Sequence, residues 1–113
     1  MDDRALEAEL AAKATAPRVT LQRLEDEIAA THIFNLGDAL AALGFSVPED
    51  ASLTTICAIT TKLGFVLVGT SACVSKDNYN PDIGGRIAKQ KAFDQLWPLE
   101  GYRLKAQLAA PAA

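Results

Sequence analysis

The chain has 113 residues, of which 50% are hydrophobic and 22% are charged, and its formal net charge is −3 at pH 7. This length predicts one folded domain, and the composition excludes an intrinsically disordered chain. The negative charge argues against general nucleic-acid binding, which depends on broad neutralisation of phosphates. No apolar run approaches the roughly 20 residues that span a bilayer, and the acidic N-terminus is unlike a signal peptide. We therefore expect a cytoplasmic protein without a membrane partner.

The charges are unevenly distributed along the chain. Residues 1–83 contain 6 Lys/Arg and 12 Asp/Glu, whereas residues 84–113 contain 5 Lys/Arg and 2 Asp/Glu. A basic C-terminal third is compatible with a small anionic ligand. Ordinary charged helix faces would give the same pattern, so charge alone does not choose between the two.

The first third of the chain predicts two helices and a connection. Residues 2–13 have helical composition and ATAP at 14–17 is typical of a linker, so residues 1–18 are interpreted as a flexible or helical extension. Thr20 is a suitable N-cap for a helix that runs to about Thr31, which would place His32 at its end. Within 33–51, LGDALAALG predicts a short helix ended by Gly44, and PEDA predicts a turn.

The strongest prediction is a β-hairpin of strands 53–61 and 65–72, which are rich in β-branched residues. With Leu63-Gly64 as the turn centre, paired residue numbers would sum to 127. Cys57 would then face Thr70, and Cys57 and Cys73 would point to opposite faces, so free thiols are expected rather than a disulfide. Neither face is clearly polar, so we expect both faces to be covered. A two-stranded hairpin is marginal in water, so we also expect further strands or a partner chain to complete the sheet.

The C-terminal part predicts helices. Asn80-Pro81 is a favourable helix start, and an apolar stripe follows it at Ile83, Ile87, Ala88, Ala92, Leu96 and Leu99. Pro98 should kink this helix or begin a second one, and residues 109–113 are expected to form a disordered tail. The predicted fold is α+β: a small antiparallel sheet built on the 53–72 hairpin, packed with an N-terminal helix and C-terminal helices, in one domain at 19–108.

The sequence offers little for catalysis. Nucleophilic catalysis would need Cys73 or a serine together with a base, and the single histidine, His32, is more typical of a surface or core residue at a helix end than of a base. No Gly-x-Ser-x-Gly, Walker loop, paired acids or metal-spaced cluster is present. We therefore expect a protein that is not an enzyme, with no catalytic residues, no metal site and no cofactor.

A binding site is better supported. The loop at 78–80 offers amides, a hydroxyl and an aromatic ring at a helix N-terminus, where an anion is favoured. Two glycines, Gly84 and Gly85, lower the helix propensity of the first turn, which indicates that something approaches the backbone closely there. The candidate ligand-binding residues are Ser71, Asn78, Tyr79, Asn80, Arg86, Lys89 and Arg103. The alternative is that the loop only forms a turn and a cap, and that Arg86 faces solvent.

Several spaced motifs in residues 53–108 resemble a family of small phage proteins that includes Thoeris anti-defence protein one. The motifs are a strand that ends in GTSAC, the loop KDNYNPDIG, the helix RIAKQKA and the segment LWPLEGYRL. The chain departs from the family at three points. Leu63-Gly64 stands at the hairpin turn where Asn-Gly is frequent, Asn80 stands where aspartate is common, and 33–51 has no clear counterpart.

The resemblance implies a non-enzymatic protein that sequesters cyclic ADP-ribose isomers, the immune signal of bacterial TIR-domain proteins. It implies a homodimer or larger homo-oligomer with pockets at protomer boundaries, acting in the cytoplasm of an infected bacterial host. The positions that match the family are the loop at 78–80, Arg86 and Arg103. From the residues alone, a phage protein–protein interaction module that inhibits a host enzyme remains the alternative.

Overall fold

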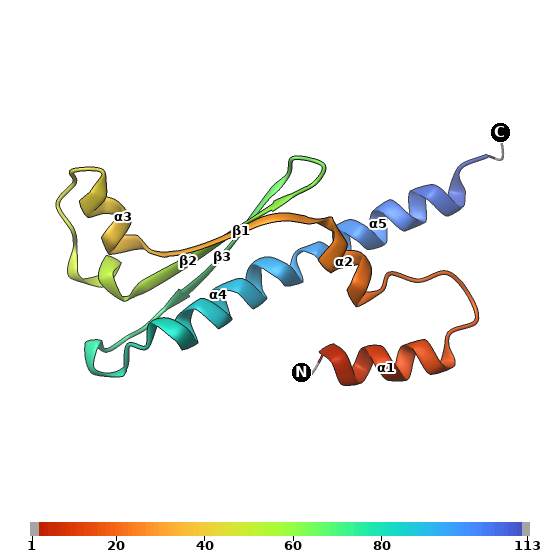
Figure 1. The fold of residues 1–113 in the computed structure, drawn as a ribbon, viewed down its shortest axis with the longest axis horizontal. Helices are drawn as coiled ribbons and strands as arrows, with labels where there is room; N and C mark the ends of the chain where they lie inside the picture. Colours follow the sequence, from red (N-terminus) through yellow and green to blue (C-terminus); the bar gives the residue numbers. More distant parts are fainter. Residues whose placement is uncertain (1–2, 112–113) are drawn as a thin grey trace.

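The computed structural model of the protein describes residues 3–111 and confirms a small α+β fold (Figure 1). The five α-helices of this range are α1 (Asp3–Lys13), α2 (Leu21–Glu27), α3 (Leu36–Ala42), α4 (Pro81–Asp94) and α5 (Leu96–Ala109). The strands are β1 (Ile28–Asn35), β2 (Thr54–Thr61) and β3 (Val66–Ala72). Short 3-10 helices, η1 (Glu49–Leu53) and η2 (Lys76–Asn78), precede β2 and α4.

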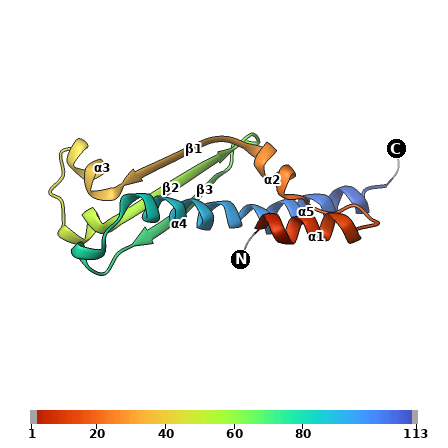
Figure 2. The ribbon, with the colours of Figure 1, turned by 60° about the horizontal axis from the view of Figure 1, so that its bottom comes forward.

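The strands form one antiparallel sheet in the order β1-β2-β3, and α4 lies along one face of it (Figures 1 and 2). Beyond the sheet, α5 continues in the direction of α4 and packs near α2, whereas α1 lies apart from the sheet (Figure 1). The chain is elongated, with extents of 56 × 31 × 17 Å and a radius of gyration of 17.8 Å. A compact chain of this length would have a radius of gyration of about 13 Å.

The predicted helix from Thr20 to Thr31 is wrong in its second half. The start is as predicted, because the Thr20 hydroxyl accepts a hydrogen bond from the Arg23 N–H at 3.0 Å. The helix ends at Glu27, and the following residues pair with β2 as strand β1. His32 is therefore an exposed residue within a strand, opposite Ala58, and not the end of a helix. Pairing with a neighbouring strand outweighed the local helical pattern.

The predicted hairpin is confirmed, but its register is wrong by one residue. Cys57 lies opposite Gly69, so paired residue numbers sum to 126. The turn has three residues rather than two, because the Thr61 N–H donates to the Phe65 carbonyl at 2.8 Å. Gly64 occupies the left-handed region with φ +86°, as three-residue hairpin loops require.

The register changes the argument about the cysteines. Cys57 and Cys73 now share one side of the sheet instead of opposite sides, so the predicted reason for their separation is wrong. Both are nevertheless free, as expected. Cys73 lies four residues beyond the partner of Cys57, which separates the two by about 13 Å along the strand and exceeds the reach of a disulfide.

One sheet face packs against α4, and the glycines make this close packing possible. Gly84 accommodates Thr55, whose Oγ1 would lie 2.8 Å from an added Cβ, and Gly85 faces Ile33. The tightest contact is at Gly69 in β3, where a Cβ would lie 2.2 Å from the Ala88 carbonyl oxygen and 2.5 Å from the Ala92 nitrogen. The close approach predicted for Gly84 and Gly85 is thus made by the sheet itself.

Within α4, only the small residues of the predicted apolar stripe are buried against the sheet. Ala88 and Ala92 are fully buried against Cys57 and Ile59, whereas Ile83 and Ile87 remain 46% and 43% exposed. A second core cluster joins Leu24, Leu67 and Leu96 beneath Trp97. The break before Pro98 is confirmed: α4 ends at Asp94 and Pro98 lies in the first turn of α5.

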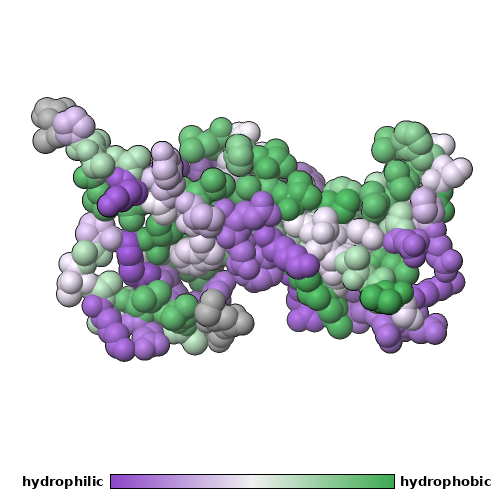
Figure 3. All heavy atoms as spheres, turned by 180° about the vertical axis from the view of Figure 1, so that it is seen from behind, coloured by the Kyte–Doolittle hydropathy of each residue, from purple (hydrophilic) through white to green (hydrophobic). Residues whose placement is uncertain are grey.

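The other sheet face is not covered by any described part of the chain. It carries alternate residues of the three strands, and most of them are apolar. The residues on this face are Ala30, His32, Phe34, Ile56, Ala58, Thr60, Val66, Val68 and Thr70. Phe34, Val66 and Val68 are 41%, 56% and 50% exposed. The view from behind shows hydrophobic residues extending from the hairpin end along the strands toward α3 (Figure 3). Both faces of the sheet were expected to be covered, but among the described residues only the face against α4 is.

The ends of the chain are described in part. The predicted N-terminal extension contains α1, and the linker after it is irregular from Ala14 to Thr20. At the other end α5 continues to Ala109, so the first residue of the predicted tail is helical. Residues 112–113 of that tail lie outside the described range.

Candidate functional site

Four of the predicted ligand residues meet in one small cavity at the start of α4. This loop cavity measures about 140 Å³ and is lined by Ser71 at the end of β3 and by Asn78, Tyr79 and Asn80. Thr55 from β2 and Gly84 from α4 form its floor with apolar neighbours. The sheet, η2 and α4 thus bring together polar groups from two separated parts of the sequence.

The helix N-terminus beside this cavity is already capped. The Asn80 side-chain oxygen accepts from the backbone N–H groups of Asp82 and Ile83 at 3.0 and 3.2 Å, and the Gly84 N–H donates to the Asn80 carbonyl at 2.9 Å. An anion at these N–H groups would have to displace the Asn80 side chain. The cavity therefore offers hydroxyl and amide groups first, and helix N–H groups only after a rearrangement.

Tyr79 is held by a hydrogen-bond network that the sequence did not predict. Its hydroxyl accepts from the Asn35 side-chain amide at 2.9 Å, and the same amide donates to the Ser52 carbonyl at 2.8 Å. The Asn35 oxygen caps α3 through the Asp38 N–H at 3.1 Å. The segment 33–51, which had no predicted role, therefore fixes the position of the candidate aromatic ring.

Thr55 is the residue that sequence reasoning missed. It is only 4% exposed, and its Oγ1 has no hydrogen-bond partner in the described structure. A buried hydroxyl without a partner costs about 1–3 kcal/mol, so most are paired. The alternating strand pattern puts Thr55 on the same side as Cys57, but only the approach of α4 shows that its hydroxyl is buried against Gly84, next to the cavity.

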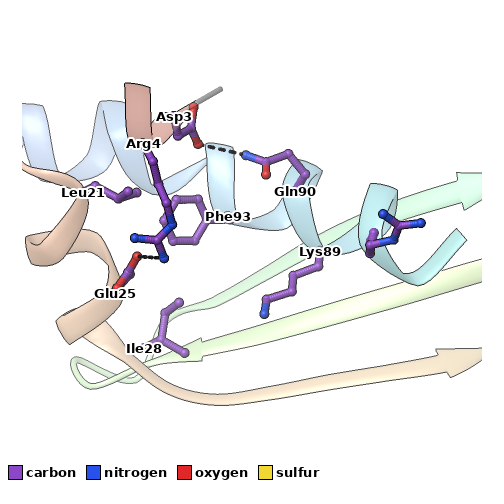
Figure 4. A pocket seen from close by; sticks show the side chains of 9 residues that line it. Asp3, Arg4, Leu21, Glu25, Ile28, Lys89, Gln90 and Phe93 are labelled. Carbon is purple, nitrogen blue, oxygen red and sulfur yellow. Dashed lines mark hydrogen bonds and ion pairs between the residues drawn. The ribbon is translucent and has the colours of Figure 1, made fainter. Parts of the chain in front are cut away.

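Arg86 and Lys89 line a different space, the helix cavity, which measures about 630 Å³ and lies between α1, α2 and α4 (Figure 4). Arg86 forms an exposed ion pair with Asp82 at 3.3 Å, which contributes little to stability. Lys89 extends toward Ile28 and has no hydrogen bond or ion pair with any described residue (Figure 4). Its charge partly offsets the effect of burial, which raises the pKa of the Cys57 thiol.

Arg103 lies in a third place, at the junction of α2 and α5. Its guanidinium contacts the buried carboxyl groups of Glu27 and Glu100 at 3.4 and 3.5 Å. Arg23 binds the same two carboxyl groups at 2.7 and 3.2 Å. In this structure Arg103 is engaged within the chain, and the seven predicted ligand residues fall into three separate groups.

No group of three or more His, Cys, Asp or Glu side chains between Asp3 and Pro111 is arranged to hold a metal ion. Over the same range, no helix combines the length and hydropathy required to cross a membrane.

Residues 19–108 match the sequence model of the phage protein (N4 Gp49/phage Sf6 gene 66) family. This range covers most of the chain, and the protein therefore belongs to that family. No curated protein and no solved structure gave a match.

Proposed function

We propose that this phage protein binds a cyclic nucleotide immune signal, a cyclic ADP-ribose isomer, and sequesters it without degrading it. The observation that carries the proposal is the loop cavity, where Ser71, Asn78, Tyr79 and Asn80 meet beside the unpartnered Thr55 hydroxyl. Hydroxyl and amide groups at this density suit the hydroxyls of a ribose and the oxygens of a phosphate.

The volume of the cavity indicates how much of the ligand one protomer holds. About 140 Å³ accommodates a sugar or a phosphate but not a whole dinucleotide. A second protomer would supply the remaining contacts, in keeping with pockets at protomer boundaries in the family that the sequence resembles. The exposed cations Arg86 and Lys89 then serve as candidates for contacts outside the loop cavity. Such a protein would act in the cytoplasm of the infected bacterium.

Thr55→Val is the sharpest test of this site. The substitution keeps the shape of the side chain and removes only the hydroxyl, so the cavity is preserved. If Oγ1 contacts the ligand, affinity should fall about fivefold, equivalent to about 1 kcal/mol. Arg103→Ala is a weaker test, because it also disturbs the buried carboxyl groups of Glu27 and Glu100.

In the functional experiment the protein is incubated with the signal from an activated TIR enzyme and divided into two samples. One sample is filtered directly to remove the protein, and the other is heated to denature the protein and then filtered. Both filtrates are assayed for the signal. Sequestration predicts that the signal disappears from the first filtrate and returns intact after heating. Signal that stays free before heating, or is destroyed after it, contradicts the proposal. Lys13→Ala, in α1, is a suitable control that should bind normally.

A second candidate is an interaction module that inhibits a host enzyme, and the open sheet face favours it. Phe34, Val66 and Val68 present an apolar surface of the kind that protein partners cover. Recovery of one stoichiometric host protein in the absence of any nucleotide binding would support this function over sequestration.

A further inference from the structure

Strand β1 forms an open edge of the sheet. It pairs with β2 on one side, and no described segment lies along its other side (Figures 1 and 2). In an antiparallel strand, every second residue directs its backbone N–H and C=O away from the partner strand. Among the described residues, no backbone group and no side chain forms a hydrogen bond to this outer side of residues 30–34. The outer side therefore offers unpaired hydrogen-bonding groups.

This β1 edge, residues 30–35, lacks the features that protect edge strands from pairing. Its residues pair regularly with β2, and the register shift of β1 lies at its start, between Ile28 and Ala30. Lysine and proline commonly protect an edge, and residues 30–35 contain neither. The opposite edge of the sheet differs, because the Gln95 side-chain amide donates to the Val68 carbonyl of β3 at 2.8 Å. The β1 edge is thus the more open of the two.

Two cations lie on the side of α4 that faces β1. Gly85 of α4 approaches Ile33 of β1, and Lys89 follows Gly85 by about one helical turn. Lys89 extends toward Ile28 at the start of β1, and Arg86 lines the same helix cavity (Figure 4). Lys89 has no hydrogen bond or ion pair with any described residue, and Arg86 forms only an exposed ion pair within its own helix. Both side chains are available to an acidic group placed beside β1.

The two faces of β1 would give an added strand different surroundings. Its side chains would alternate between the two faces of the sheet. On the α4 face they would adjoin Thr31 and Ile33 and come within reach of the Lys89 ammonium group. On the open face they would adjoin Phe34, which is 41% exposed. The strand that fits this edge therefore alternates acidic residues with apolar residues.

The charges of the neighbouring residues support an acidic partner. Asp3 of the helix cavity accepts a hydrogen bond from the Gln90 side chain at 3.3 Å. Glu25, the other acidic residue of this cavity, pairs with Arg4 at 3.8 Å. A second copy of β1 would fit less well, because its sequence IAATHIFN contains no acidic residue. The basic side chains beside β1 thus favour an acidic segment of another protein over a second copy of this strand.

We propose that the β1 edge binds an extended segment of another protein in which acidic and apolar residues alternate. The segment adds a strand to the three-stranded sheet through backbone hydrogen bonds with residues 30–35. Its acidic side chains contact Lys89 and Arg86, and its apolar side chains extend the open face of the sheet beside Phe34. This surface is separate from the loop cavity and does not depend on the proposed nucleotide binding.

The first test measures the binding of two labelled peptides by fluorescence anisotropy at low ionic strength. One peptide alternates glutamate with valine over about eight residues, and the other alternates lysine with valine. Wild type should bind the glutamate peptide, and Lys89→Glu should weaken this binding about tenfold and strengthen binding of the lysine peptide. Lys91→Glu is the matched control and should bind as wild type does, because Lys91 lies one turn before Gln95, on the side of α4 that contacts β3. Wild type that binds neither peptide at roughly 100 micromolar or binds both equally, or equal losses in the two variants, would overturn the proposal.

The second test locates the bound peptide by backbone amide hydrogen exchange. The glutamate peptide should slow exchange at those amides of residues 30–35 that point away from β2, and it should leave β3 unchanged. The same peptide with a methyl group on every backbone nitrogen has no backbone donor and should bind at least about tenfold more weakly. Slowed exchange in β3 instead of β1, or equal binding of the methylated peptide, contradicts the proposed pairing. Slowed exchange in β1 that grows with protein concentration in the absence of peptide would assign the edge to a second copy and also overturn the proposal.

Discussion

The two ends of strand β2 make an instructive comparison, because each places a threonine on the buried face of the sheet. Thr55 and Thr61 are 4% and 5% exposed and differ mainly in their hydrogen bonds. Thr61 Oγ1 accepts from the Phe65 N–H at 3.0 Å and closes the hairpin turn. Thr55 Oγ1 is buried beneath α4 without a partner among the described residues, and Thr55 is one of the residues around the loop cavity. The first threonine hydroxyl stabilises the hairpin turn, whereas the second is left without a hydrogen bond among the described residues.

Each end of the sheet also contains one unsatisfied polar atom, and the two atoms differ in chemistry. The Thr55 hydroxyl can donate or accept a hydrogen bond, which suits the mixed polar groups of a nucleotide. Glu27 Oε1 can only accept one while the carboxyl group is ionised, and its surroundings are otherwise charge-balanced and apolar. The two buried atoms therefore differ in that one can donate or accept a hydrogen bond and the other can only accept one.

The largest expected effect on stability concerns the close contact between Gly69 of β3 and the backbone of α4. Gly69→Ala would place a Cβ within 2.2 Å of the Ala88 carbonyl oxygen, and neither backbone can yield without separating α4 from the sheet. We expect a loss of about 3 kcal/mol or more in the free energy of unfolding, measured by urea denaturation. Gly101→Ala is the matched control: its Cβ meets nothing within 4 Å, and it should stabilise α5 by about 0.5–1 kcal/mol. A Gly69→Ala variant as stable as wild type would contradict the packing described.

The next largest effect is expected at Thr61, the threonine at the hairpin end of β2. Thr61→Val removes the acceptor of the Phe65 N–H and leaves the shape of the side chain unchanged. We expect destabilisation of about 1–2 kcal/mol in urea denaturation, because a part-buried donor loses its partner. Unchanged stability would indicate that water replaces the hydroxyl at this turn.

Thr55→Val should change the free energy of unfolding in the opposite direction to Thr61→Val. The same change at the other end removes a buried hydroxyl that has no partner, so the ligand-free protein should gain about 1 kcal/mol in the free energy of unfolding. Ligand affinity should fall in the same variant, as stated above. A variant that loses stability would mean that the Thr55 hydroxyl is satisfied in solution, and the proposed role of the cavity would lose its main support.

The smallest effect concerns the attachment of α1, away from both ends of β2. The Glu7 carboxylate accepts the Leu21 backbone N–H and pairs with Arg18, and these contacts lower the pKa of Glu7 below its usual 4.5. Because the pKa of Glu7 is lower in the folded than in the unfolded state, the ionised carboxylate stabilises the protein when the pH is above the pKa of the unfolded chain. This contribution is lost as the pH falls through the folded value. The protection factor of the Leu21 amide, which corrects its exchange rate for the intrinsic effect of pH, should fall as the pH drops below about 4.5, and Glu7→Gln should remove this pH dependence. Identical pH profiles for the two proteins would show that Glu7 does not hold α1 in place.

The sequence by itself determined the elements whose signals are local. The hairpin at 53–72, the helix started by Asn80-Pro81, the break near Pro98 and the end of α3 before Gly44 all depend on residues a few positions apart. The gathering of Ser71 and the loop at 78–80 followed from the same local order, because a strand end and the next helix start must lie close together.

Tertiary structure alone decided what depends on partners far along the chain. Residues 28–35 joined β2 as a strand, although the predicted helix ran on to about Thr31. The edge of β2 supplied hydrogen bonds that an isolated helix end could not. The register shifted by one residue because Gly64 allowed a three-residue turn, and this exchanged the faces on which the side chains of β3 lie. Arg103 met Glu27 and Glu100 rather than the loop cavity, because the distance between helices is set by packing and leaves no trace in residue spacing.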